Sequence, residues 1–216
     1  QFASASRDDP PLYRNISSAI QSHLLEQRRR LKTTPLAGWS YHRWMDQALS
    51  ALWLLDNAPL DRETSAELLD LLNILRAQGV DREAFFEELR ANGTSPRMSD
   101  EMLHNVNVAQ GIKSAAVIAR FNATAGMSMA ELARRRMETL DARYGLPTGV
   151  FVGDELLPRT QTANRNPSRG SELCGVVESI FSYVTLFRVF GDVAFADRAE
   201  RIAYNALPAT WASPRG

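Results

Sequence analysis

The sequence has a single cysteine, Cys174, only two lysines among its 25 basic residues, no net charge and no long uninterrupted apolar run. One cysteine excludes an internal disulfide and a cysteine-rich zinc module. The balance of 25 basic and 25 acidic residues gives no overall field that would hold a polyanion, so we expect no nucleic-acid partner. Without about 18 consecutive apolar residues, the sequence also predicts no membrane partner.

The arginines include two triplets, residues 28–30 and 134–136, that resemble nucleic-acid patches when taken alone. Each lies in a helical pattern with acidic neighbours, Glu26 beside the first triplet and Glu131 and Glu138 beside the second. Such mixed charge is typical of a solvated helix face. The compartment and the oligomeric state stay open. Residues 1–11 lack the apolar segment of a signal peptide, while three Asn-X-Ser/Thr triplets permit secretion without showing it.

The hydrophobic pattern is helical along almost the whole chain, which predicts an all-α fold. Apolar residues recur every three or four positions in a series of stretches. These predicted helices cover about residues 12–31, 41–56, 62–78, 81–91, 100–121, 128–144, 172–190 and 192–206. Short connections, such as residues 57–61 with Pro59 and Asp61, make consecutive helices antiparallel neighbours. The sequence therefore predicts consecutive αα-hairpins, stacked either as an open solenoid or as a closed toroid.

Residues 150–171 lose the helical periodicity and form the longest predicted loop. Segment 149–153, at its start, is the one stretch that resembles a strand. Long loops in compact domains often carry function. Glu155 and Glu172, near the two ends of the loop, could supply the pair of carboxyl groups that glycoside hydrolysis uses. From spacing alone, however, the plainer interpretation is favoured: Glu155 is a surface acid and Glu172 an acid at the start of a helix.

Other candidate residues also have a plainer structural interpretation. His104 precedes a polar cluster in residues 105–110, which is typical of the start of a helix. A lone cysteine such as Cys174 is most often a small buried apolar residue. Of the tryptophans, Trp53 falls in an apolar stripe, whereas Trp39, in a turn, is the better candidate for lining a sugar-binding cleft.

Several of these motifs together resemble one family, glycoside hydrolase family 127, the β-L-arabinofuranosidase-like proteins. The strongest segment, 171–178, contains a Glu-X-Cys motif. It is followed by a Gly-Asp turn at 191–192, an Asp-X-X-Glu-Arg sequence at 197–201 and Tyr204-Asn205. The family has these elements in this order. Upstream, the segment His104-Asn105-Val106-Asn107 resembles the family's histidine segment, and Asp154-Glu155 resembles its glutamate segment. The resemblance covers about residues 38–211.

The resemblance implies an (α/α)6 barrel, which in characterised members is followed by β-sandwich domains. It implies a retaining glycoside hydrolase acting on terminal furanosides such as β-L-arabinofuranosides, with zinc bound by one glutamate and three cysteines. Glu172 and Cys174 match two of the metal ligands, Glu155 matches the general acid/base, and His104 matches a histidine that contacts the sugar. In such a site a zinc-bound thiolate attacks the anomeric carbon, while a glutamate protonates the leaving oxygen and then activates water.

The chain departs from the family in its ligands and its helix count. The family's other two cysteines form a pair downstream of the Tyr-Asn segment, whereas this sequence has no second cysteine. A full toroid has twelve helices, against about eight predicted here. The expectation is a partial catalytic barrel over residues 1–216, without N-terminal hairpins and C-terminal β-domains, inactive alone and binding zinc weakly. Two alternatives stay open: a metal-free six-hairpin enzyme that uses two carboxylates, and a non-catalytic α-hairpin scaffold.

Overall fold

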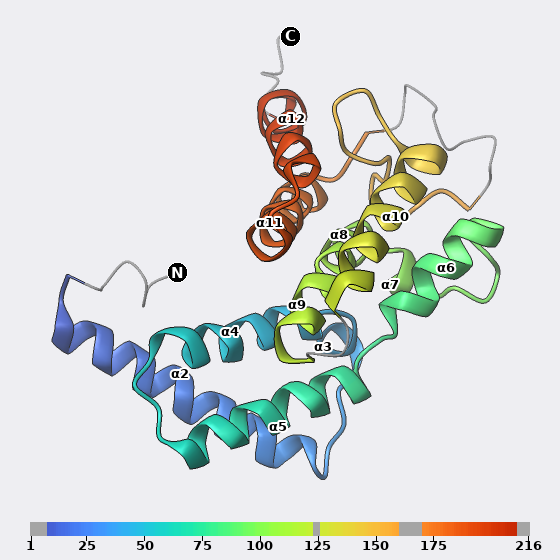
Figure 1. The fold of residues 1–216 in the computed structure, drawn as a ribbon. Helices are drawn as coiled ribbons and strands as arrows, with labels where there is room; N and C mark the ends of the chain where they lie inside the picture. The colour runs from blue at the N-terminus through green and yellow to red at the C-terminus, as the bar shows by residue number, and fades with distance from the viewer. Residues whose placement is uncertain (1–7, 123–125, 160–169, 211–216) are drawn as a thin grey trace, which may run out of the picture. The chain divides into compact units, whose positions relative to one another are not determined.

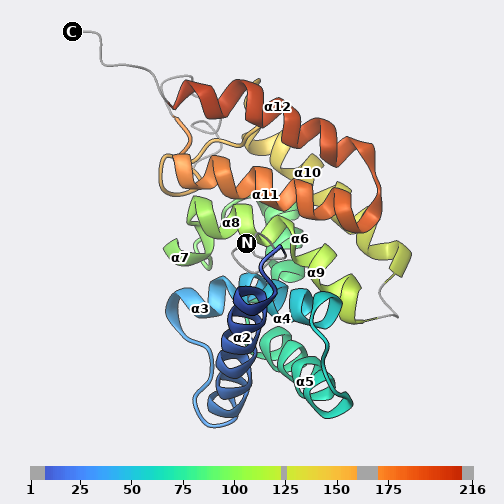
Figure 2. The ribbon, with the colours of Figure 1, turned by 90° about the vertical axis from the view of Figure 1, so that its left-hand side faces the viewer.

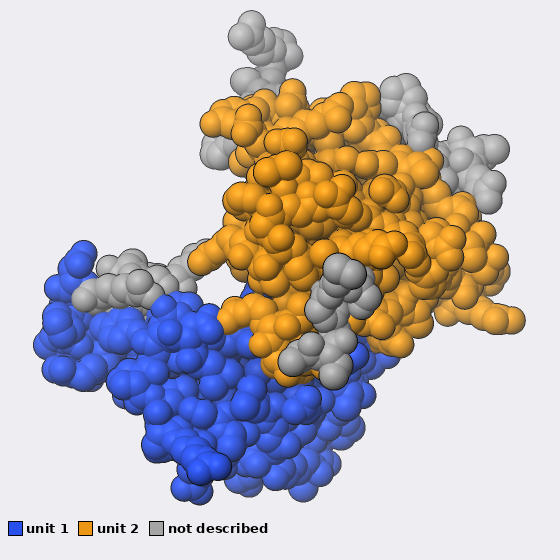
Figure 3. All heavy atoms as spheres, in the orientation of Figure 1, with its two compact units in different colours: residues 1–80 blue, residues 81–216 orange. Residues whose placement is uncertain are grey.

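The computed structural model describes residues 8–122, 126–159 and 170–210, and over these residues the fold is all-α. It contains eleven helices, labelled α2 to α12 in Figures 1 and 2, and in the described residues no strand. The predicted all-α class is thus confirmed. The chain divides into two compact units, Gln1–Val80 and Asp81–Gly216, which Figure 3 shows in different colours.

The first unit consists of α2 (Pro10–Leu31), α3 (Gly38–His42), α4 (Trp44–Asn57) and α5 (Arg62–Gln78). Helices α4 and α5 form the antiparallel pair that the sequence predicts. Asp61 caps α5 by accepting a hydrogen bond of 2.6 Å from the Thr64 amide. The core consists of nearly fully buried apolar side chains: Met45, Ala48, Leu52, Leu68, Leu71, Leu72 and Leu75. Arg28 of α2 donates hydrogen bonds to Glu67 and Asp70 of α5, which ties α2 to this pair.

The second unit contains the remaining helices. They are α6 (Arg82–Asn92), α7 (Asp100–Leu103), α8 (Asn105–Ile112), α9 (Ser114–Phe121), α10 (Gly126–Tyr144), α11 (Leu173–Phe190) and α12 (Val193–Ala209). Helix α11 packs against α8, α9 and α12, while α10 packs against α9 and α6. Gly191, with a left-handed φ of 69°, ends α11, and the side chain of Asp192 caps α12. The two helices therefore return side by side as the expected hairpin (Figure 2).

The predicted continuous helix over residues 100–121 was wrong. The segment forms three helices, interrupted at His104 and at Lys113. The backbone of His104 is extended (φ −55°, ψ 128°) because its neighbours pair with a distant segment. The two hydrogen bonds of this pairing run from the Asn105 amide to the Glu155 carbonyl (2.8 Å) and from the Leu157 amide to the Leu103 carbonyl (2.9 Å). A tertiary contact thus overrides a helical sequence pattern.

Segment 149–153, which resembles a strand in the sequence, does not form one. Its residues make isolated bridges, Gly145 with Phe151 and Gly153 with Ser171. The segment lies between the end of α10 and the start of α11. It forms one bridge with the residue after α10 and one with a residue just before α11. A strand needs a continuous partner ladder, and none is present in the described part of this unit.

The two arginine triplets behave differently. Arg29 and Arg30 are exposed and donate hydrogen bonds to Glu26, as expected for a solvated helix face. These bonds lower the pKa of the Glu26 carboxyl to about 2. In the second triplet, Arg136 is only 1% exposed, so the prediction of a solvated face was wrong for this residue. The helical stripe that faces the interior of the unit includes position 136.

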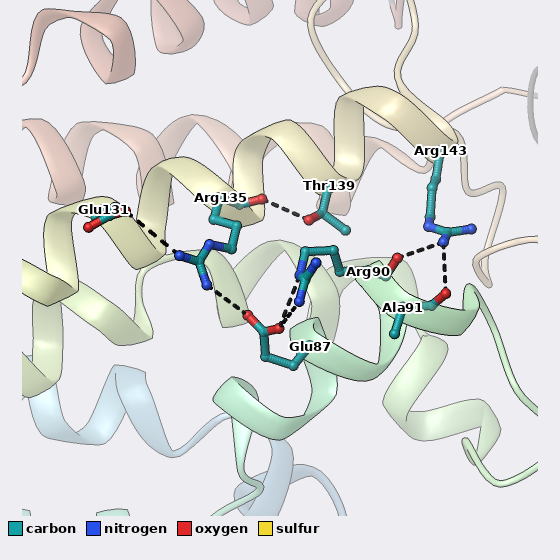
Figure 4. A network of polar contacts seen from close by, with 7 residues as sticks. All are labelled: Glu87, Arg90, Ala91, Glu131, Arg135, Thr139 and Arg143. Carbon is teal, nitrogen blue, oxygen red and sulfur yellow. Dashed lines mark hydrogen bonds and ion pairs between the residues drawn. The ribbon is translucent and has the colours of Figure 1, made fainter.

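A surface network ties α10 to α6 (Figure 4). The Glu87 carboxylate lies between Arg90 of its own helix (2.7 Å) and Arg135 of α10 (3.6 Å). The Arg143 guanidinium donates to the backbone carbonyl of Arg90 (2.6 Å) and to that of Ala91 at the end of α6. A cation at carbonyls that lack a helical partner is favourable at a helix C-terminus. The network links the two helices at the protein surface, where each ion pair contributes little to stability.

A partly buried ion pair joins α12 to α10. The Arg198 guanidinium donates to both carboxylate oxygens of Asp141 (2.6 and 2.5 Å) and to the Gly149 carbonyl (3.1 Å), and 14% of its side chain is exposed. We expect Arg198→Met to lower the free energy of unfolding by about 1–2 kcal/mol, because bidentate charged hydrogen bonds are lost. Urea unfolding measures this loss. Adding Asp141→Asn to the Arg198→Met variant should lower the free energy of unfolding little further. If the double variant instead loses the sum of the two single losses, the two side chains are not coupled.

Within the described residues, α11 is the one helix long and apolar enough to cross a membrane, judged by length and composition alone. One such helix is weak evidence, because core helices of folded domains meet the same criteria. Here α11 packs against four other helices and carries the buried hydroxyls of Ser179 and Ser182. The expected lack of a membrane partner stays a prediction.

Candidate functional site

Three segments of the second unit meet at one place, which we call the loop junction: residues 103–105, 153–157 and 170–172. The first two are joined by the backbone hydrogen bonds described above. The third joins them because the Glu172 amide donates to the Gly153 carbonyl (2.9 Å) and the Gly153 amide donates to the Gly170 carbonyl (3.2 Å). The backbone positions of His104, Glu155 and Glu172, far apart in the sequence, therefore lie on neighbouring segments.

Asn105 lies at the centre of the loop junction and is 1% exposed. Its side-chain amide donates a hydrogen bond to the Gly153 carbonyl. A Cβ atom added at Gly175 would lie 1.8 Å from its Oδ1, and one added at Gly153 would lie 2.5 Å from its Nδ2. The amide is thus enclosed by two glycines and fixes the start of α8 against the start of α11. In the sequence Asn105 resembles any polar residue at a helix start, because its partners are distant in the chain.

His104 and Glu155 lie on paired backbone segments but differ in their surroundings. His104 stands between α7 and α8, its backbone bridges to Leu156, and its side chain is partly exposed. The side chain of Glu155 is exposed. The structure thus brings together the backbone positions of the predicted sugar-contacting residue and of the predicted acid/base.

Glu172 and Cys174 lie at the start of α11. Glu172 is the N-cap residue, yet its side chain makes no capping hydrogen bond, and its buried Oε2 atom has no hydrogen-bond partner. Cys174 is exposed, so the expectation that a lone cysteine is buried is not met. An orphaned carboxylate oxygen near an exposed thiol suits a metal ion. However, the described residues contain no group of three or more His, Cys, Asp or Glu that could hold one.

The predicted cleft tryptophan, Trp39, belongs to the first unit. Its side chain is half exposed, and the Arg43 guanidinium lies 4.5 Å from the centre of its ring. Trp53 contacts Tyr13 edge to face and is partly exposed, whereas Trp44 is buried in the core of this unit. Trp39 is therefore not among the residues that the loop junction unites.

The motif residues of α12 hold the fold together. Asp192 caps the helix and pairs with Arg134 of α10 (2.5 Å), and Arg198 binds Asp141. Arg201 donates to the Pro147 carbonyl (3.0 Å). These contacts attach α12 to α10 and to the segment that leads into the loop junction. The part of the resemblance carried by residues 192–201 thus corresponds to packing contacts in this chain.

A second polar cluster in the same unit was missed by sequence analysis. Lys113, at the break between α8 and α9, is fully buried, and its Nζ lies 3.2 Å from Oε2 of Glu178 on α11. The same Nζ lies 4.7 Å from the centre of the Phe181 ring. In the sequence, Lys113 is a single charged residue within an apolar helical pattern. Nothing in that pattern indicates that Glu178 is its partner.

No protein-family model, curated protein or solved structure matches this chain.

Proposed function

We propose that this chain forms part of a retaining glycoside hydrolase that acts on terminal furanosides, with β-L-arabinofuranosides as the first candidates. The observation that carries the proposal is the loop junction. It gathers His104, Glu155 and Glu172 with the adjacent Cys174, the same ordered set on which the family resemblance rests. Motif residues that are spread along a chain can form one site only if the fold brings their segments together. In this chain, backbone hydrogen bonds join the three segments that carry them.

We further propose that the helices of the second unit are part of an (α/α)6 toroid. Helices α11 and α12 form a tight antiparallel hairpin, α8 lies beside α11, and α10 packs on α9. This arrangement supports alternating inner and outer helices, with α8, α9 and α11 in one layer. In such a toroid the loop junction lies at the ends of the helices of that layer.

Each residue has a distinct role in this proposal. The exposed Glu155 carboxyl donates a proton to the leaving oxygen and then accepts one from the attacking water. His104 hydrogen-bonds a sugar hydroxyl beside it. Asn105 keeps these two residues in place relative to α11 through its contacts with Gly153 and Gly175.

The residues present fit a zinc ion only in part. Glu172 offers an orphaned oxygen and Cys174 an exposed thiol, but a closed zinc site has four ligands. The sequence has no second cysteine, and the described residues place no third acidic or histidine side chain close enough. Zinc, when bound, supplies the positive charge that keeps a thiolate ligand deprotonated. Two ligands alone give weak binding.

This ligand assignment is tested with Co²⁺, which reports thiolate coordination by its absorption. We expect a thiolate-to-cobalt band that saturates only at high micromolar metal or above. Cys174→Ser should abolish the band and Glu172→Gln should weaken binding, while Glu131→Gln, at an exposed site on α10, should change neither. The absence of any band at millimolar Co²⁺, or unchanged affinity in Glu172→Gln, would overturn the assignment.

The catalytic role is tested by hydrolysis of p-nitrophenyl β-L-arabinofuranoside. In a protein that combines this sequence with the further thiolate ligands, Glu155→Gln is expected to lower kcat by roughly a hundredfold, because the base that activates the water releasing the sugar is lost. The p-nitrophenolate group leaves without a proton, so the glycosyl intermediate should accumulate and KM should fall as well. Glu131→Gln is again the matched control, and normal turnover by Glu155→Gln contradicts the acid/base role.

A further inference from the structure

We propose that Glu178 and Phe181 of α11 form a subsite for a sugar ring, with the buried Lys113 holding the carboxylate in place. This inference rests on the proposed function and names residues, outside the motifs that match the family, that contact the substrate. The ligand class is a neutral, hydroxyl-rich ring with one apolar face.

The first observation is the asymmetry of the Lys113–Glu178 ion pair. The Lys113 side chain is fully buried, whereas 26% of the Glu178 side chain is exposed. A buried ammonium is costly unless it is paired, so the contact with Lys113 fixes the position of the Glu178 carboxylate. The exposed part of that carboxylate remains able to accept hydrogen bonds from sugar hydroxyls.

The second observation concerns the Phe181 ring. The Lys113 ammonium lies 4.7 Å from the ring centre, and 44% of the residue is exposed. Because the Lys113 ammonium is buried, it lies on the inner face of the Phe181 ring. The outer face of the ring remains open to solvent. An exposed aromatic ring beside a fixed polar group is the usual composition of a site that orients a small ligand.

The third observation is the place of these residues on the helix. Cys174, Glu178 and Phe181 follow one another at spacings of four and three, which puts them on one face of α11. At a rise of about 1.5 Å per residue, Glu178 lies about 6 Å and Phe181 about 10 Å along the axis from Cys174. Glu178 and Phe181 thus lie one to two turns beyond Cys174, which follows the loop junction, within the span of a sugar bound there.

A sugar explains this surface better than an apolar protein partner does. Exposed Val177 and Val184 lie near Phe181 on the same side of the helix, and alone they would suit a hydrophobic partner. Such a partner would, however, also cover the Glu178 carboxylate and remove it from water without offering hydrogen bonds, which is unfavourable. A ligand that carries both hydroxyls and an apolar ring face satisfies both groups.

The test is titration of the chain with methyl β-L-arabinofuranoside, followed by backbone amide chemical shifts in NMR. Phe181→Leu and Glu178→Gln are each expected to raise Kd at least fivefold. Phe187→Leu is the matched control, since Phe187 is an exposed phenylalanine that lies six residues, about 9 Å along the axis of α11, beyond Phe181, and it should change Kd less than twofold. All variants are measured well below their Tm, with Tm recorded for each.

The outcomes separate the two proposals. If the wild-type chain does not bind the furanoside, both the proposed function and this subsite are overturned. If it binds, with shifts confined to the loop junction and unchanged Kd in Phe181→Leu and Glu178→Gln, the subsite alone is overturned. Binding of a second protein copy to this face would appear as concentration-dependent broadening of α11 signals without sugar, and it too would overturn the subsite.

Discussion

Gly175→Ala is expected to lower the free energy of unfolding of the second unit by about 3 kcal/mol or more. The added Cβ would lie 1.8 Å from Oδ1 of Asn105, a distance that no real contact shows. Asn105 cannot yield, because it is buried and bound to the Gly153 carbonyl. Either α11 shifts away from α8 or the buried amide loses its hydrogen bond, and both changes are costly. Urea unfolding, with hydrogen exchange of the α8 and α11 amides, measures the effect.

Two variants make this prediction specific. Gly170→Ala adds the same methyl group where nothing lies within 4 Å, so it should change stability by less than about 0.5 kcal/mol. The double variant Asn105→Ala/Gly175→Ala removes the clashing amide and should be more stable than Gly175→Ala alone. If Gly175→Ala unfolds like Gly170→Ala, the start of α11 does not pack on Asn105, and the convergence of the motif residues fails with it.

Arg136→Ala is expected to cost roughly 3 kcal/mol or more. Arg136 is almost fully buried, and its Nη1 donates to the Gly111 carbonyl (3.2 Å) at the end of α8 and to Ser114 Oγ (2.6 Å) at the start of α9. Truncation leaves a cavity against Phe86, whose ring centre lies 5.1 Å from the guanidinium, and removes both hydrogen bonds. The break between α8 and α9 then loses its cap.

Arg136→Met separates the effects of volume, hydrogen bonding and charge. Burial lowers the pKa of Arg136 to about 10, so the charged form is disfavoured in the folded state and costs stability at neutral pH. Methionine keeps most of the volume and avoids this cost, so we expect a smaller loss, about 1–2 kcal/mol. Arg135→Met, at an exposed neighbour, should change stability by less than about 0.5 kcal/mol. Equal losses for Arg136→Ala and Arg136→Met would show that the hydrogen bonds, and not the filled volume, hold this break.

The sequence predicted helices well where the chain is amphipathic and bounded by capping residues. Helix α5 was expected over residues 62–78 and spans Arg62–Gln78, because Asp61 is a good N-cap and the leucines keep a helical period. The hairpin of α11 and α12 was expected for the same reason, from Gly191 and Asp192. These signals are local, so one sequence suffices to predict them.

The sequence failed where distant segments compete for the same backbone groups. The region 100–121 has a helical pattern throughout, but pairing with residues 155–157 extends the backbone at His104. Arg136 resembles a surface arginine in composition, yet the helical phase of α10 turns it inward. The break at His104 and the burial of Arg136 both depend on residues that are distant in the chain. The local sequence pattern therefore could not predict them.

For the candidate site, the sequence supplied the chemical groups and the fold supplied their neighbours. His104, Glu155, Glu172 and Cys174 were selected by motif alone, whereas Asn105 and Gly175, which hold the segments together, carried no distinctive signal. The pairing of Lys113 with Glu178 was equally invisible, since the two residues lie on different helices.

The sequence by itself determined that this protein is all-α, that helix pairs such as α4 and α5 are joined by short connections, and that one cysteine limits any metal site. These properties follow from periodicity, capping residues and counts, which do not depend on the path of the chain. The tertiary structure decided where helices break, which arginines are buried, and which backbone segments lie beside His104. Such features depend on backbone and side-chain groups that satisfy one another across the fold, since a buried polar group must find its partner wherever the packing places it.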